Sequence, residues 1–95
     1  MKRFSIIQEE KKCLVCGSKQ NIHIHEVFFG INRTKSIADG CCVYLCGRHH
    51  NQSNDSVHFN KKLDIEIKKS MEKRWLVYYN KTIDEFINRY GKNYL

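Results

Sequence analysis

Apolar and polar residues alternate most regularly over residues 22–29, where the sequence reads IHIHEVFF. Alternation with β-branched and aromatic residues is typical of a strand with one buried face. A second apolar run, CCVYL at 41–45, predicts another strand, and the two are expected to pair as an antiparallel hairpin. The polar segment between them, GINRTKSIADG at 30–40, is bounded by glycines and predicts a long loop.

In the last third of the chain, the spacing of the apolar residues changes to that of a helix. An apolar stripe recurs every four residues there, at Leu63, Ile67, Met71 and Trp75. The stripe predicts one amphipathic helix over 61–80, with Asn60 as its N-terminal cap. TIDE at 82–85 is a capping box that opens a last helix, and Gly91 is placed to end it.

The remaining segments are polar. Residues 1–12 predict a short strand or an irregular arm, and residues 46–60 predict a short helix or turn. The chain of 95 residues has no proline, internal repeat or low-complexity linker, so it predicts a single α+β domain.

Charge and cysteine usage narrow the chemistry. There are 17 Lys and Arg against 10 Asp and Glu, a formal net charge of +7, which indicates an anionic partner such as nucleic acid. Five cysteines is an odd number for a set of disulfides. No secretory signal and no apolar run of membrane-spanning length is visible. We therefore expect an intracellular protein whose reduced thiols are available to a metal.

Two short motifs have the spacing of zinc ligands. CLVC places Cys13 and Cys16 two residues apart, and CGRH places Cys46 and His49 at the same spacing. Each such pair can contact one ion from a single turn, and together they make a tetrahedral Cys3His set. A structural zinc would also stabilise so small a domain. The two other cysteines, Cys41 and Cys42, are expected to be core residues.

Four further histidines and a glutamate form a second candidate cluster: His23, His25, His50, His58 and Glu26. His50 follows the zinc ligand His49 directly, and the hairpin is expected to bring His25 beside it. A single histidine is more simply a structural side chain, and for His58 a surface role is as good an interpretation as a ligand. Several histidines that converge beside a zinc site indicate chemistry.

The layout of these motifs resembles the HNH nucleases, which have the ββα-metal fold. The resemblance covers residues 13–60, through CLVCG, HEVFFG and YLCGRHHN, and leaves 61–95 as a helical extension. The LCGRHHN…VHFN run is also similar to phage-encoded, recombination-associated, RecA-dependent nucleases. What the resemblance implies is a small ββα-metal domain with a zinc knuckle and two C-terminal helices.

The resemblance also implies roles. One divalent cation stabilises charge at the scissile phosphate, a histidine of the first strand takes a proton from water, and a histidine of the helix binds the cation. His25 matches the base by its distance from Cys16, and His50 matches the ligand. The family's middle asparagine has no clear counterpart here; Asn32 and Asn54 are the candidates.

The order Ile24-His25-Glu26 departs from the family, because isoleucine stands where a ligand is usual. Two registers follow. In the favoured one His25 is the base, and the cation is bound by His50 with Glu26 or His23. In the other, His25 binds the cation and Glu26 is the base. Glu26 could also only orient a histidine.

Basic residues near the expected site are candidates for phosphate contacts. Arg33 and Lys35 lie in the predicted loop, and Arg48 lies within the second zinc motif. The lysines of the long helix are more simply solubilising.

Together these observations predict a DNA endonuclease with a structural Zn²⁺ and one catalytic divalent cation, Mg²⁺, Mn²⁺, Ni²⁺ or Zn²⁺. Its expected partners are DNA and, through the phage-type resemblance, a recombination protein, with no membrane. The alternatives are a non-catalytic, zinc-stapled nucleic-acid-binding module and a zinc module for protein interactions.

Overall fold

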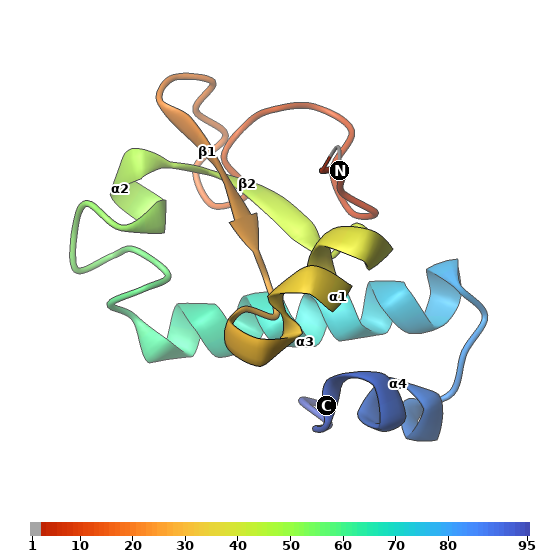
Figure 1. Cartoon of the computed structure of the whole chain (residues 1–95). Coiled ribbons are helices and arrows are strands. Elements are labelled where there is room, and N and C mark those ends of the chain that lie inside the picture. The colour runs from red at the N-terminus through yellow and green to blue at the C-terminus, as the bar shows by residue number, and fades with distance from the viewer. Residues whose placement is uncertain (1–2) are drawn as a thin grey trace.

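Two antiparallel strands form the only sheet within residues 3–95, the part of the chain described by the computed structural model. They are β1 (Ile22–Glu26) and β2 (Cys42–Cys46), and His25 pairs with Val43 while Glu26 pairs with Cys42. The predicted hairpin is therefore confirmed, although the first strand ends at Glu26. Helices lie below and beside this hairpin, which gives a small α+β fold (Figure 1).

The segment between the strands is helical, so the prediction of a loop over 30–40 is wrong. It contains a 3-10 turn, Gly30–Asn32, and helix α1, Arg33–Asp39. Gly40 ends α1 in the left-handed conformation, with a φ of 73°. The buried Ser36 hydroxyl donates to the carbonyl of Cys41 across 2.6 Å. These tertiary contacts stabilise a helix that composition alone does not indicate.

Three more helices follow β2. They are α2 (Gly47–His50), α3 (Lys61–Tyr78) and α4 (Ile83–Tyr90). The predicted caps are confirmed: the Asn60 side chain accepts from the backbone N–H of Leu63, Thr82 and Glu85 form a capping box, and Gly91 is left-handed. None of the helices in residues 3–95 is long and apolar enough to cross a membrane.

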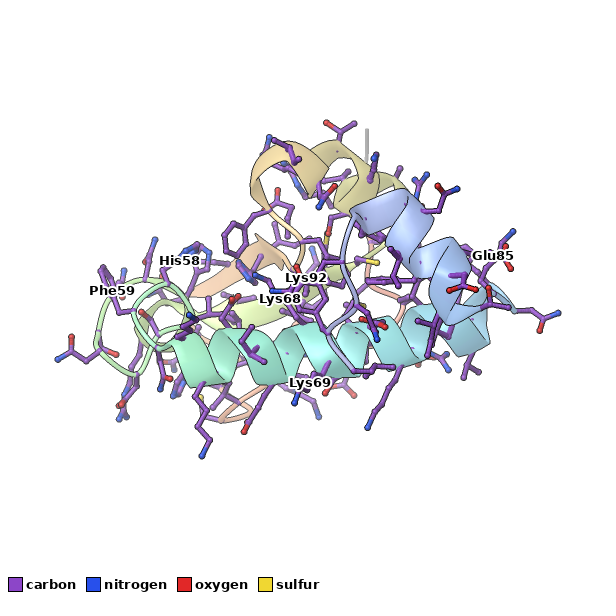
Figure 2. All side chains as sticks on the ribbon, turned by 90° about the horizontal axis from the view of Figure 1, so that it is seen from below. His58, Phe59, Lys68, Lys69, Glu85 and Lys92 are labelled. Atoms are coloured by element: carbon purple, nitrogen blue, oxygen red, sulfur yellow. The ribbon has the colours of Figure 1, made fainter. Side chains whose placement is uncertain are left out.

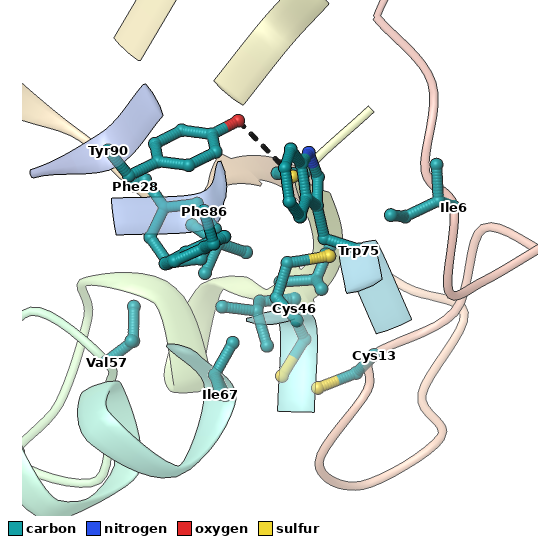
Figure 3. Packing of buried hydrophobic residues seen from close by; sticks show 14 residues of the cluster. Ile6, Cys13, Phe28, Cys46, Val57, Ile67, Trp75, Phe86 and Tyr90 are labelled. Carbon is teal, nitrogen blue, oxygen red and sulfur yellow. Dashed lines mark hydrogen bonds between the residues drawn. The ribbon is translucent and has the colours of Figure 1, made fainter. Parts of the chain in front are cut away.

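The core lies between the hairpin and the apolar stripe of α3 (Figure 3). Ile67, Met71 and Trp75 are buried, as the four-residue spacing predicted. Phe86 of α4 packs edge-on against Trp75, with ring centroids 5.3 Å apart. Helix α4 thus completes the core rather than extending away from it.

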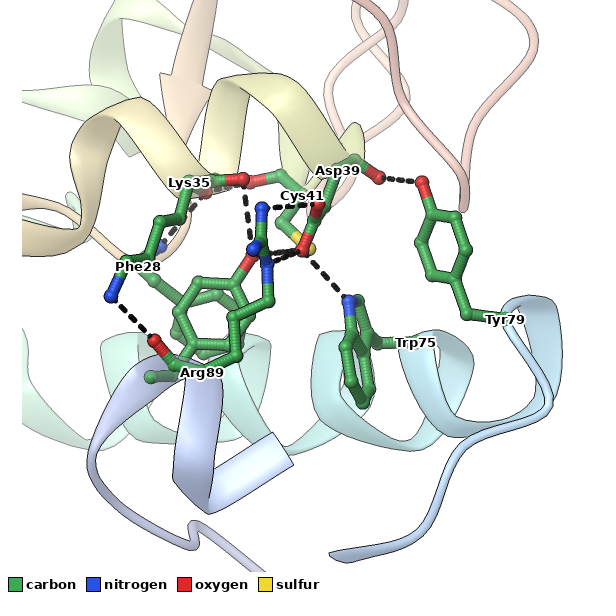
Figure 4. A network of polar contacts seen from close by, with 9 residues as sticks. Phe28, Lys35, Asp39, Cys41, Trp75, Tyr79 and Arg89 are labelled. Carbon is green, nitrogen blue, oxygen red and sulfur yellow. Dashed lines mark hydrogen bonds and ion pairs between the residues drawn. The ribbon is translucent and has the colours of Figure 1, made fainter. Parts of the chain in front are cut away.

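A partly buried carboxylate holds α1, α3 and α4 together (Figure 4). Asp39 accepts hydrogen bonds from Trp75 Nε1 at 2.9 Å and from the Tyr90 hydroxyl at 2.7 Å, and it forms a two-point ion pair with Arg89. Tyr79 adds a hydrogen bond to the Asp39 carbonyl. Each helix contributes a polar group, so their relative positions depend on this one residue.

The segment before the zinc motif is irregular from residue 3 to residue 12, which confirms the arm rather than the strand. It runs beside β2, on the side away from β1, and its Ile6 carbonyl accepts from Arg74 of α3. Ile6 donates its backbone N–H to the carbonyl of Gly40, and the Gln8 side chain accepts from the backbone of Tyr44. The arm therefore satisfies backbone groups along the outer edge of β2 and connects that edge to α3.

Candidate metal centres

Cys13, Cys16, Cys46 and His49 come together at one end of the hairpin. Their potential ligand atoms all lie within 4.8 Å of one another. Cys16 Sγ is 3.8 Å from Cys46 Sγ, and His49 Nδ1 is 3.6 Å from Cys13 Sγ and 3.2 Å from Cys46 Sγ. The two spaced motifs thus form the predicted Cys3His cluster.

These separations suit a tetrahedral ion. Usual zinc–sulfur and zinc–nitrogen bond lengths give sulfur–sulfur and sulfur–nitrogen edges of about 3.8 Å and about 3.6 Å. Two of the three separations agree, and the third, between Cys46 and His49, is shorter. No disulfide joins any cysteine. The cluster is positioned to bind a metal ion, and its soft thiolates with one imidazole favour zinc.

The turn that carries Cys13 and Cys16 also favours the thiolate. Gly17 has a φ of 75° and donates its N–H to the Cys13 carbonyl at 2.9 Å, which closes the turn. Burial alone would raise the pKa of Cys13, but backbone hydrogen bonds from Cys46, Cys16 and Val15 lower it to about 6. A deprotonated thiol is the form that binds zinc.

Cys41 and Cys42 are fully buried core residues, as predicted. Burial raises the pKa of Cys41 to about 12 and that of Cys42 to about 11. Both therefore stay protonated, small and apolar.

Helix α2 separates two clusters, because its consecutive residues His49 and His50 face in different directions. The chain then turns back, and the backbone N–H groups of Val57 and His58 donate to the carbonyls of His49 and His50 at 2.7 and 3.4 Å. This pairing places His58 next to His50. Figure 2 shows His58 and Phe59 near the N-terminal end of α3.

His25, His50 and His58 form the second group that could hold a metal, again with ligand atoms within 4.8 Å. The Nε2 atoms of His50 and His58 are 3.2 Å apart. Two imidazole nitrogens on one tetrahedral ion would be separated by about 3.3 Å at usual bond lengths. Because the ligand atoms are imidazole nitrogens, the group suits Zn²⁺ or Ni²⁺ better than Mg²⁺ or Mn²⁺, which prefer oxygen ligands.

His25 is the buried member of this group, with 2 % of its surface exposed. Its Nε2 atom is buried and has no hydrogen-bond partner. Burial, with the charges of His50 and His58 added, lowers the pKa of His25 to about 3. The ring is therefore neutral, and an unsatisfied nitrogen beside two other imidazoles fits a cation or a water bound there.

His23 lies beside this group, and His50 is the member of the group to which it hydrogen-bonds. Its Nδ1 is 2.8 Å from Nδ1 of His50, and its Nε2 is 3.3 Å from Oδ1 of Asn21. It shares a strand face with His25, as predicted, because side chains of a strand alternate.

Glu26 lies on the other face of β1, away from the histidines. Its Oε1 accepts from Arg3 at 2.9 Å and is 3.2 Å from Arg33. Burial alone would raise the pKa of Glu26, but its own backbone N–H and these two arginines lower it. The structure therefore brings His25, His50 and His58 together and leaves Glu26 in an ion pair.

The predicted phosphate contacts are exposed but have partners. Arg48 forms a 2.7 Å ion pair with Asp55, Arg33 pairs with Glu26, and Lys35 donates to the carbonyl of Arg89. Of the two asparagines considered, Asn32 donates to the carbonyl of Tyr90 and lies outside the histidine cluster.

Sequence reasoning missed one neighbour of the cluster. Lys68 Nζ lies 4.4 Å from the centroid of the Phe29 ring, and that ring lies 5.9 Å from those of both His25 and His58. Lys68 also pairs with Asp64 at 2.8 Å. In the sequence, Lys68 directly follows Ile67 of the apolar stripe and looks like one more solubilising lysine of the long helix. Nothing in the local pattern indicates that it lies near the histidines.

Comparisons with family models, curated proteins and solved structures found no match for this chain.

Proposed function

We propose that the protein is a metal-dependent DNA endonuclease of the HNH type, in which the Cys3His cluster holds a structural zinc and His25, His50 and His58 form the reaction centre. The observation that carries the proposal is the convergence of these three histidines beside the Cys3His cluster. A purely structural zinc module has no need of a second imidazole group with a buried, unpartnered nitrogen.

His50 and His58 would hold the cation, and His25 would act as the general base. His25 is placed to act as the base because its Nε2 has no hydrogen-bond partner and lies beside His50 and His58, where it could accept a proton from a water bound there. A divalent cation bound by His50 and His58 would stabilise negative charge at the scissile phosphate. The Lys68 ammonium lies over the neighbouring Phe29 ring, where a phosphate could compete with Asp64 for it.

The net charge of +7 supports DNA as the substrate, since neutralising phosphates provides affinity without sequence choice. The partners of Arg33 and Arg48 are exposed or shared carboxylates that a phosphate backbone could displace. A recombination protein as a further partner rests on the phage-type resemblance alone.

Nicking of supercoiled plasmid tests the proposal. We expect conversion to the open circle that requires an added divalent cation, with Ni²⁺, Mn²⁺ and Mg²⁺ tested in parallel, and that is lost in His50→Ala. The matched control is Lys69→Ala, which removes a basic residue from α3 outside the cluster. If the wild type binds DNA in a salt-dependent way but never nicks it, the non-catalytic binding module is correct.

A further inference from the structure

We infer that His23 is a positioning residue, which determines the ring nitrogen that His50 presents to a cation. The inference rests on the cation site proposed above. It gives His23 a role different from that of the metal ligand suggested by the sequence.

The direction of the hydrogen bonds follows from Asn21. Its Oδ1 can only accept, so Nε2 of His23, 3.3 Å away, must carry the proton. A neutral imidazole has one N–H, which leaves Nδ1 of His23 as an acceptor. Nδ1 of His50 therefore donates across the 2.8 Å contact, and Nε2 of His50 has no proton. That bare nitrogen is the one that lies 3.2 Å from Nε2 of His58.

The orientation of the Asn21 amide is itself held by Gln52. Nδ2 of Asn21 donates to Oε1 of Gln52 at 3.2 Å, which turns Oδ1 toward His23. Gly47 leaves room for this pair, because a Cβ there would lie only 2.2 Å from the Gln52 oxygen and 2.3 Å from the Asn21 nitrogen. Asn21, just before β1, and Gln52, just after α2, thus together fix the tautomer of His23 and, through it, that of His50.

The separation of the two Nδ1 atoms argues against a shared ion. At 2.8 Å it is a normal hydrogen bond, and it is shorter than the edge of about 3.3 Å expected for two imidazoles on one tetrahedral metal. An imidazole ligand whose second nitrogen donates to an acceptor is held in place and made more basic, and loss of such a partner typically weakens metal binding by about 10–100-fold.

The tautomer can be observed directly. Long-range ¹H–¹⁵N correlation spectra of the full chain, zinc-loaded at the Cys3His cluster and recorded at about pH 8, where imidazoles are neutral, report which nitrogen carries the proton. We expect His50 protonated at Nδ1 and His23 at Nε2. A proton on Nε2 of His50 would overturn the inference.

Nickel binding distinguishes positioning from ligation. In His23→Asn the side-chain oxygen can occupy the place of the lost Nδ1 and accept from His50, whereas the similarly sized His23→Leu cannot. We expect Ni²⁺ titrations to give near wild-type affinity for His23→Asn and a loss of about 10–100-fold for His23→Leu. Equal losses in both variants, or no loss in either, would contradict a positioning role.

Neither readout uses DNA. A protein that never nicks plasmid but shows the expected tautomer and nickel affinities would disprove the proposed nuclease and leave the role of His23 standing. Cation-dependent nicking with the other His50 tautomer, or with equal nickel affinities in the two variants, would support the nuclease and disprove the role of His23.

Discussion

His25 and Glu26 are consecutive residues of β1, yet their side chains serve opposite faces of the sheet. His25 lies among His50 and His58, whereas Glu26 pairs with Arg3 and Arg33. The two-residue period of the strand makes this unavoidable. This placement argues against the register with Glu26 as the base. In the other register, His58, rather than Glu26 or His23, lies with His50 beside His25.

This separation predicts that Glu26→Gln keeps metal-dependent nicking while the fold loses a little stability. Because the pKa of Glu26 is lowered in the folded state, its contribution is present above the unfolded value of about 4.3 and is lost as pH falls through the folded value. We expect a loss of about 1 kcal/mol or less near pH 7, measured by urea unfolding, that vanishes in acid. Loss of nicking with intact folding would instead place Glu26 in the reaction.

The Cys3His cluster predicts one tightly bound zinc per chain that stabilises the fold. Cys16 is exposed, so Cys16→Ser removes a ligand without opening the core. We expect zinc content after dialysis against a chelator to fall toward zero and unfolding to become easier by about 3 kcal/mol or more. The buried Cys42→Ala is the control, since it should lose stability but keep its zinc. Equal zinc content in Cys16→Ser and the wild type would contradict the assignment.

Asp39 should be the most sensitive polar residue outside the metal centres. Asp39→Ala leaves the Trp75 indole, the Tyr90 hydroxyl and the Arg89 guanidinium without their shared acceptor. We expect a loss of about 3 kcal/mol in the free energy of unfolding, with nickel binding unchanged in the folded protein. The milder Asp39→Asn keeps one oxygen and should lose less. An unchanged melting temperature would show that the network carries no stability.

Glu72 provides a test with the opposite pH dependence. Its side chain is fully buried in α3, one oxygen accepts from the backbone N–H of Tyr94, and the other has no partner. Burial raises its pKa, so this carboxyl favours folding below the unfolded value of about 4.3 and opposes it as pH rises through the folded value.

Glu72→Gln removes that ionisation. We expect the variant to be more stable than the wild type at pH 7 to 8, by urea unfolding, and the difference to shrink as pH approaches about 4. An identical difference at all pH values would show that Glu72 does not titrate with folding.

Much of the fold and the whole Cys3His cluster could be predicted from local sequence patterns. The Cys3His cluster follows from the spacing of CLVC and CGRH, the helix ends from Asn60, Thr82 and Gly91, and the long helix from its stripe. These features depend on residues that are close in sequence, so one sequence is enough to reveal them.

What the sequence did not reveal depends on distant contacts. Helix α1 is stabilised by the hydrogen bond from Ser36 to the Cys41 carbonyl and by the ion pair between Asp39 and Arg89 of α4. Both partners lie outside residues 30–40, so the sequence of that segment does not reveal the helix. The bond between His23 and His50 needs α2 to end beside β1. Charge counting likewise could not indicate that Arg33 and Arg48 have carboxylate partners.

The most direct test of the account is His25→Ala, assayed together for plasmid nicking, structural zinc and Mn²⁺ or Ni²⁺ binding. We expect nicking to fall by at least about 100-fold, while zinc remains and the second cation is still bound by His50 and His58. Wild-type nicking by His25→Ala would contradict the proposed base, and loss of the second cation along with nicking would make His25 a ligand instead.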